Sequence, residues 1–300
     1  MPRKRYWMLL KSFITYLTHE KRYSQHTVTS YQTDLDQFDE FVKALELDFS
    51  EVKHTHLRSY LVELMEKENS ENTINRKISA LRSFYKFLHR SGKIDQNPSL
   101  LIKAPKIPKR LPVFVDARKM DQLLDSERYF DESFPSVRDH LVIELLFGTG
   151  IRLTELLQLK DTDIDLYSGT IKVLGKRNKE RIVPINKQLI NQVNTYIDLK
   201  KLQNFNNNSL ILIVTNTGAA AYPKLIYRIV TAYLNHVSTN EKKSPHVLRH
   251  SYATSLLNAG ADLNAIKELL GHSSLAATQV YTHNSIERLK TIYKQAHPKA

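Results

Sequence analysis

The segment Lys242–Tyr252 places a histidine and an arginine at the start of an expected helix. Ser244 is a favoured N-cap residue and Pro245 a favoured first helical residue, so His246 falls in the first turn. Arg249 follows three residues later, on the same helix face. Because a helix N-terminus attracts phosphate, this pair could clamp a phosphate and move a proton. A capping histidine and a surface ion pair are the alternative.

His246 and His250 also have the four-residue spacing found in some zinc-binding helices. A metalloprotease helix carries glutamate directly after its first histidine, where this sequence has Val247. Neither a carboxylate cluster nor a cysteine completes a metal site in the sequence. We therefore expect no metal ion and no other cofactor.

Two more candidate residues follow the end of another expected helix. An apolar stripe from Leu263 to Leu270 stops at Gly271, a residue typical of the position after a helix. His272 should therefore lie at a defined corner of the chain. Tyr281 comes nine residues later among polar neighbours, which suits an exposed hydroxyl better than a core tyrosine.

Earlier in the chain, two basic residues lie beside glycines. Arg152 follows the glycine turn 148–150 at a helix start, where it could meet phosphate. Glu155 could orient a neighbouring basic group or simply pair with Arg152. Lys176 lies beside Gly175 at the expected tip of a β-hairpin, where a loop could deliver its ammonium group. A plain basic loop is the simpler interpretation, since its neighbours are Arg177, Lys179 and Arg181.

The order of these residues resembles the tyrosine recombinase (phage-integrase-type) family, which carries Arg, Lys, His, Arg, His or Trp, and Tyr in this order. Within that family the chain is similar to the short Xer-type recombinases, and the resemblance covers nearly the whole chain. One departure is Arg177, where many relatives have glycine. The matching residues are Arg152, Lys176, His246, Arg249, His272 and Tyr281, and the similar segments are 149–156, 174–181, 244–254, 270–281, 24–41 and 71–98.

This resemblance implies a site-specific recombinase that cuts and rejoins DNA through a covalent 3′-phosphotyrosine, by way of a Holliday junction. It implies double-stranded DNA as partner and a tetramer of identical or different recombinase subunits. Whether a DNA translocase takes part stays open. The implied roles are nucleophile for Tyr281, phosphate binding for Arg152, Arg249 and His272, acid/base partner of the tyrosine for His246, and acid for the leaving 5′ oxygen for Lys176.

Two other classes of function remain open from the sequence. A type IB topoisomerase uses similar catalytic chemistry, but the expected two-domain layout and the Xer-like segments argue against it. A DNA-binding protein without activity is the non-enzyme alternative, and the complete set of six residues argues against that. The joining of two specific duplexes would separate these classes.

A basic, proline-rich segment, residues 103–112, is expected to be a linker. It separates two groups of helices and strands that must position these residues. Residues 1–102 carry four apolar stripes at helical spacing and are expected to form a helical, SAM-like core-binding domain. Residues 113–300 are expected to form a mixed α/β catalytic domain of the DNA breaking–rejoining type. The expected fold is therefore mainly α with a small antiparallel sheet. Within 113–300 we expect a buried helix at 139–146, a hairpin at 171–185 and a strand at 210–215.

Basic residues recur along the expected helix 74–88, where they could form a solvated face or lie against DNA backbone. They are Arg76, Lys77, Arg82, Lys86 and Arg90.

Beyond Tyr281, a capping pair, Asn284 and Glu287, starts an apolar stripe at 286–296. It predicts a C-terminal interaction helix, which could dock on a neighbouring subunit or fold back on its own domain.

Charge and composition agree with a polyanionic partner. The 300 residues hold 44 basic and 31 acidic side chains, a formal net charge of +13, which favours nucleic acid or an anionic surface. The absence of cysteine excludes disulfides and a thiol nucleophile. The apolar runs are too short for a membrane span and no secretory signal is visible, so a cytoplasmic location is expected.

Overall fold

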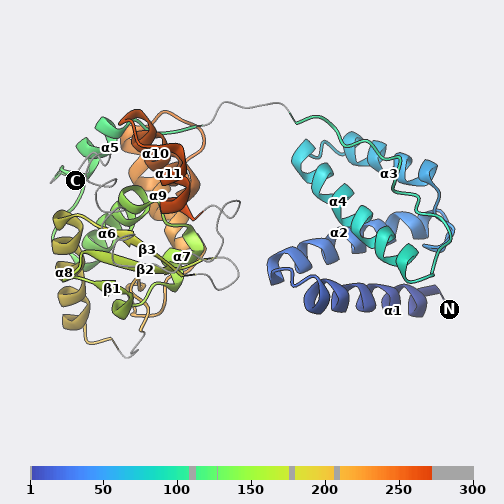
Figure 1. Cartoon of the computed structure of the whole chain (residues 1–300), viewed down its shortest axis with the longest axis horizontal. Coiled ribbons are helices and arrows are strands. Elements are labelled where there is room, and N and C mark those ends of the chain that lie inside the picture. Colours follow the sequence, from blue (N-terminus) through green and yellow to red (C-terminus); the bar gives the residue numbers. More distant parts are fainter. Residues whose placement is uncertain (1, 108–112, 127, 176–179, 206–209, 272–300) are drawn as a thin grey trace. The chain divides into compact units, whose positions relative to one another are not determined.

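A computed structural model describes residues 2–107, 113–126, 128–175, 180–205 and 210–271, with side chains from Trp7 onward. The chain divides into two compact units, Met1–Arg110 and Leu111–Ala300, each of which is described by itself (Figure 1). The first unit is helical and the second combines helices with a small sheet. The predicted fold class, mainly α with a small antiparallel sheet, is confirmed.

Serine caps fix the starts of two helices in the first unit. The Ser24 hydroxyl accepts from the Thr27 N–H, and the Ser70 hydroxyl accepts from the Thr73 N–H. These bonds satisfy donors that a helix start leaves free. The helices are α1 (Pro2–Thr15), continued by a π-helical turn (Tyr16–Glu20), then α2 (Gln25–Ala44), α3 (His54–Glu66) and α4 (Glu71–Arg90).

Aromatic side chains fill the space between these helices. Phe13, Phe38 and Phe84 are fully buried. Phe13 meets Phe84 edge-on with ring centroids 5.3 Å apart, and Phe38 meets Tyr60 edge-on at 5.0 Å. Such pairs stabilise beyond simple burial, so the first unit has a core of its own.

The basic residues of α4 are largely engaged inside the first unit. Lys77 is buried, and its Nζ lies 3.1 Å from an Asp34 carboxylate oxygen of α2. Arg76 pairs with the other oxygen of Asp34, and Arg82 donates to the Ile102 carbonyl. Lys77 is therefore neither a solvent-exposed residue nor a DNA contact, because its ammonium group links α4 to α2.

The second unit contains a three-stranded antiparallel sheet in the order β1-β2-β3. β2 and β3 confirm the predicted hairpin strands, and Val173 faces Arg181 in their register. The strand predicted at 210–215 is wrong, because this segment makes only isolated bridges, Lys160 with Ile211 and Val214 with Ala220. The strands are β1 (Ile164–Asp165), β2 (Thr170–Leu174) and β3 (Glu180–Pro184).

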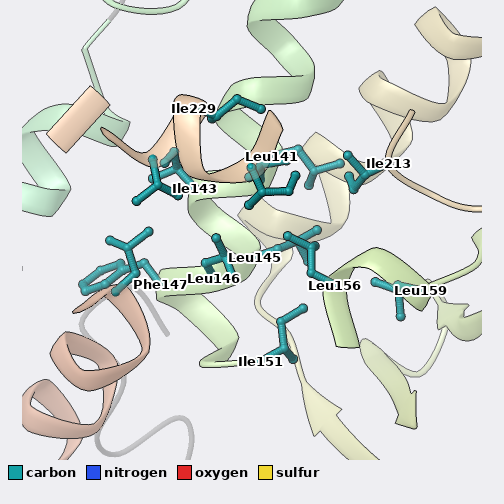
Figure 2. Packing of buried hydrophobic residues seen from close by; sticks show 14 of the residues in the cluster. Leu141, Ile143, Leu145, Leu146, Phe147, Ile151, Leu156, Leu159, Ile213 and Ile229 are labelled. Atoms are coloured by element: carbon teal, nitrogen blue, oxygen red, sulfur yellow. The ribbon is translucent and has the colours of Figure 1, made fainter. Parts of the chain in front are cut away.

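Helix α6 is the centre of this unit. It is buried nearly all round and packs against α7, α8, α9 and α10, which confirms the helix predicted at 139–146. Figure 2 shows Leu141, Leu145 and Leu146 of α6 among the apolar side chains of this core. The helices are α5 (Ala117–Leu124), α6 (Phe134–Thr149), α7 (Leu153–Gln158), a 3-10 turn (Asp161–Asp163), α8 (Lys187–Leu202), α9 (Pro223–Val237), α10 (Pro245–Asn258) and α11 (Leu263–Leu270).

Gly150 ends α6 in the left-handed region, with φ of 61°. A Cβ atom there would lie 2.4 Å from Cδ1 of the fully buried Tyr252 on α10. Both the backbone conformation and the close approach therefore require glycine. The turn brings the end of α6 directly onto α10.

In the part of the chain that the structure describes, no helix is long and apolar enough to cross a membrane.

Candidate active site

Arg152 stands at the N-cap of α7, directly after the Gly150 turn. Its backbone N–H donates to Oε2 of Glu155 at 2.7 Å, and its Nη1 donates to Oε1 of the same carboxylate at 2.7 Å. Its Nη2 donates to the Gly271 carbonyl at 2.9 Å. The expected Arg–Glu pair is present, and it turns the guanidinium toward the end of α11.

Arg249 reaches the same corner from α10. Helix α10 begins at Pro245 after Ser244, as predicted, although the Ser244 hydroxyl makes no capping bond. The buried Arg249 guanidinium donates to the Gly150 carbonyl and, at 2.6 Å, to the Leu270 carbonyl. His246 lies one turn earlier on α10 with an exposed side chain. The structure therefore brings Arg152 and Arg249 together at α11, with His246 on the adjoining first turn.

The last carbonyls of α11 are shared among three arginines from three elements. Arg181 of β3 donates from Nε to the Leu269 carbonyl at 3.1 Å, Arg249 to that of Leu270, and Arg152 to that of Gly271. A helix C-terminus leaves its final carbonyls without helical partners and carries partial negative charge. The three arginines supply both hydrogen-bond donors for these carbonyls and positive charge near the helix end. They therefore fix the corner that precedes His272 in the chain.

Glu155 is the carboxylate at the centre of this cluster. Besides its two bonds from Arg152, it accepts from Nη1 of Arg181 at 2.7 Å and from Nη2 at 2.9 Å. Each oxygen thus accepts two hydrogen bonds, which fills its lone-pair positions. Burial alone would raise the pKa of Glu155, but the bonds and charge of Arg181 and the bonds from Arg152 lower it to about 2. The group stays ionised and acts as an anchor rather than as a proton acceptor.

The cluster keeps an excess of positive charge. Three guanidiniums, those of Arg152, Arg181 and Arg249, surround the single carboxylate of Glu155, which leaves a surplus of two charges. Burial first, and then the charges of Arg152 and Arg181, lower the pKa of Arg249 to about 10. Arg249 is therefore still cationic at neutral pH, and the corner is suited to bind an anion.

Gly271 closes the corner with a φ of 64°. A Cβ atom there would lie 3.1 Å from Cδ of Arg181 and 3.3 Å from its Nε. Glycine is required by the left-handed backbone and by the closeness of the arginine. The predicted helix end at Gly271 is confirmed.

Family models place the chain among known proteins. The model described as Phage integrase family matches residues 114–288, and the one described as Phage integrase, N-terminal SAM-like domain, matches residues 10–92. The chain belongs to the phage integrase family. Both compact units of this phage integrase family member are thus covered by a family model.

Relatives of the chain are tyrosine recombinases. Tyrosine recombinase XerC from Chlorobaculum parvum is 37% identical over 97% of this chain and 94% of that protein. XerC from Bacillus subtilis is also 37% identical, over 97% of this chain and 96% of that protein. These relatives confirm the prediction of an Xer-type tyrosine recombinase, an enzyme of site-specific DNA recombination.

A solved structure shares the fold. The XerH site-specific recombinase, bound to its palindromic difH substrate in a post-cleavage complex, superimposes with a TM-score of 0.71 at 25% identity. The match covers 88% of this chain and 78% of the XerH chain. It confirms the predicted combination of a helical N-terminal domain and a mixed α/β catalytic domain. The boundaries 1–102, 103–112 and 113–300 stay a prediction.

Three of the six predicted site residues lie outside the described residues. They are Lys176, His272 and Tyr281. The ends of β2 and β3, Leu174 and Glu180, flank the segment that holds Lys176, and Gly271 directly precedes His272. The predicted C-terminal interaction helix also falls beyond residue 271. The roles of these residues therefore stay predictions.

Sequence reasoning does not identify Arg181, because its basic neighbours favour a plain basic loop. It lies on β3, it is buried, and it holds Glu155 and the end of α11. A signal was present, because Arg181 and the buried Val183 are two residues apart and so point to the same face of the strand. An arginine at an inward strand position predicts a buried partner.

No metal site is evident at the candidate histidine pair. His250 lies one turn after His246 and is half-buried on α10. Across the residues that the structure describes, no group of three or more His, Asp or Glu side chains is arranged to hold a metal ion.

Proposed function

We propose that this chain breaks and rejoins DNA through a covalent link between Tyr281 and a DNA 3′ phosphate. The tyrosine oxygen attacks the scissile phosphorus, the bond from phosphorus to the 5′ oxygen breaks, and a free 5′ hydroxyl leaves with the proton it receives. The phosphotyrosine conserves the energy of the broken bond. Attack by a 5′ hydroxyl from a second duplex then releases the tyrosine and, after two rounds of exchange, resolves a Holliday junction.

The convergence of Arg152 and Arg249 at the end of α11 is the observation that carries this proposal. Charge builds on the non-bridging phosphate oxygens in the transition state, and guanidiniums can bind two such oxygens at once. The two arginines are held from different elements by Glu155, Gly150 and the α11 carbonyls. Their positions are thus set before DNA arrives, which is what transition-state stabilisation requires.

The remaining roles follow from the family's order of residues. His272, directly after the held corner, donates a hydrogen bond to the phosphate. His246, exposed at the first turn of α10, exchanges the proton of the Tyr281 hydroxyl. Lys176, between β2 and β3, protonates the leaving 5′ oxygen. These steps use protein side chains alone, so no divalent ion is needed.

Double-stranded DNA is the proposed partner, bound by recombinase subunits that assemble in fours. Support comes from the XerH complex with difH and from the net charge of +13. We propose residues 1–102 as the core-binding domain, 103–112 as the linker and 113–300 as the catalytic domain. The border between the compact units, after Arg110, supports this division because it falls within the proposed linker.

A nicked suicide substrate tests the covalent step. Cleavage beside the nick releases a short fragment that cannot religate, so wild-type protein should accumulate a 3′-phosphotyrosyl adduct, mapped to Tyr281 by mass spectrometry. Tyr281→Phe removes one oxygen and should form no adduct while it still binds the site. Tyr167→Phe is the matched control, because Tyr167 is fully solvent-exposed and stands between β1 and β2, and it should react like wild type.

Strand exchange between two matched sites separates the alternatives. A recombinase joins the two duplexes, a type IB topoisomerase only relaxes supercoiled plasmid, and an inactive binding protein forms no adduct. An adduct at another tyrosine would overturn the assignment of Tyr281.

A further inference from the structure

Burial of the Arg181 guanidinium costs free energy, and packing of the strand does not require an arginine at this position. Its side chain is 6% exposed, and in the register of the sheet it faces Val173. Val183, the next inward residue of β3, is buried and apolar. An apolar side chain would fit this face, and a guanidinium in the interior is tolerated only when it is fully paired. The function of Arg181 must therefore lie in what it binds.

The guanidinium of Arg181 joins three elements of the site, β3, α7 and α11. Nη1 and Nη2 make a parallel fork onto the two oxygens of Glu155 on α7, and Nε holds the Leu269 carbonyl of α11. Its backbone belongs to β3, one residue after the strand begins at Glu180. A fork of this kind fixes both distance and orientation of the carboxylate.

Arg181 and Arg152 bind the same carboxylate but differ in exposure. The side chain of Arg152 is 23% exposed, against 6% for Arg181. Arg152 can thus meet a phosphate from solvent, while Arg181 is covered by protein and its Nε, Nη1 and Nη2 all donate to protein acceptors. Any effect of Arg181 on an incoming phosphate must pass through Glu155 and through the corner at Leu269–Gly271.

We propose that Arg181 is a positioning residue for catalysis, which aligns Arg152 through Glu155 and fixes the end of α11. This inference rests on the proposed recombinase chemistry. It assigns to β3 a role beyond carrying one side of the hairpin: the strand locks the phosphate-binding arginines in place. A shift of about 1 Å in such a group can cost about 100-fold in rate.

The test compares single-turnover adduct formation at saturating nicked DNA in Arg181→Met and wild type. Arg181→Met keeps an unbranched apolar side chain but removes the guanidinium, and it should lower the rate by about 100-fold. DNA affinity, measured in the Tyr281→Phe background, should change by less than about threefold. Arg138→Met is the matched control, because Arg138 is a buried arginine of the same unit, 5% exposed and paired with Asp139. Its rate should stay within about threefold of wild type.

A double-mutant cycle separates positioning from general loss of stability. If Arg181 acts through Glu155, the Arg181→Met/Glu155→Gln pair should lose no more than about threefold beyond the slower single variant. Arg181→Lys keeps the charge but not the planar fork and should lose about 10-fold. It serves as the readout if Arg181→Met does not fold.

Three results would overturn the inference: equal losses for Arg181→Met and Arg138→Met, multiplied losses in the double variant, or a wild-type rate in Arg181→Lys. Absence of any adduct in wild-type protein would instead overturn the proposed recombinase chemistry, so the two failures are distinguishable.

Discussion

Each unit of the molecule buries a carboxylate between two basic side chains, yet the two clusters are built differently. In the first unit, Asp34 of α2 pairs with Arg76 and Lys77 of α4, and Lys77 also donates to Gln37. All of these groups belong to two packed helices. In the second unit, Glu155 pairs with Arg152 and Arg181, which come from different elements. Both arginines also donate hydrogen bonds to carbonyls at the end of α11.

The difference lies in where the surplus charge is placed. Arg76 and Lys77 meet one aspartate, so a single positive charge remains, and both cations belong to the same helix, α4. Around Glu155 a third cation, Arg249, is held by the carbonyls of Gly150 and Leu270. The first arrangement fastens two helices. The second gathers two surplus charges from three elements at one corner, which suits it to bind an anion.

Loss of Arg249 should have the largest effect. Arg249→Gln removes a guanidinium that we assign to the transition-state phosphate, so adduct formation should fall by about 100- to 1,000-fold. The rate is measured in a single turnover at saturating nicked DNA and well below the melting temperature. Arg138→Gln, in the same unit, serves as the control. Equal losses in the two variants would mean that loss of any buried arginine of this unit slows the reaction, and would contradict a special role for the corner at α11.

Loss of Lys77 should affect stability and not catalysis. Lys77→Met leaves Asp34 with Arg76 alone, and unfolding free energy should fall by about 2 kcal/mol, less than for a buried charge left with no partner. Urea unfolding measures this change, and adduct formation per folded molecule should match wild type. The Asp34→Leu/Lys77→Met pair should regain part of the stability, because an apolar pair needs no ionic partner. A loss of cleavage without a loss of stability would restore the view of Lys77 as a DNA contact.

The stability that the ionised Glu155 carboxylate adds should be present at neutral pH and lost in acid. Its pKa of about 2 in the folded chain lies below its ordinary value of 4.5. A lowered folded pKa stabilises the protein above the unfolded pKa, and this stabilisation is lost as pH falls through the folded value. The difference in unfolding free energy between wild type and Glu155→Gln should therefore shrink from about pH 5 toward about pH 2. A difference that stays constant over this range would contradict the assignment of the ionised carboxylate.

Local signals in the sequence were sufficient for most elements of the fold. The buried run of α6 and the stop at Gly271 each depend on neighbours within a few residues, and both are found in the structure. Strand β1 has only two residues, too few to produce an alternating pattern. The segment 210–215 is apolar enough for a strand but makes isolated bridges, a choice that tertiary packing decides.

The arrangement of the site required information that no local pattern contains. Lys77 looked like one of a row of surface cations, because its partner Asp34 is 43 residues away on another helix. The family's order of residues pointed to Arg152 and Arg249, but not to the carbonyls that hold them. Arg181 lies on the inward face of its strand with Val183, and that alternation is the part of the site that sequence reasoning could have used.

The hydrogen bonds at the end of α11 also determine when this corner can form as the chain is synthesised. They link residues separated along the chain by 119 positions for Arg152 and Gly271, 88 for Arg181 and Leu269, and 21 for Arg249 and Leu270. Contacts between residues far apart in the chain slow folding, because a long loop must close before they form. A nascent chain that ends before Leu269 carries Arg152, Arg181 and Arg249 without their acceptors at the end of α11, so this corner is incomplete. Until Gly271 has been added, the α11 carbonyls that hold Arg152, Arg181 and Arg249 are therefore not all available.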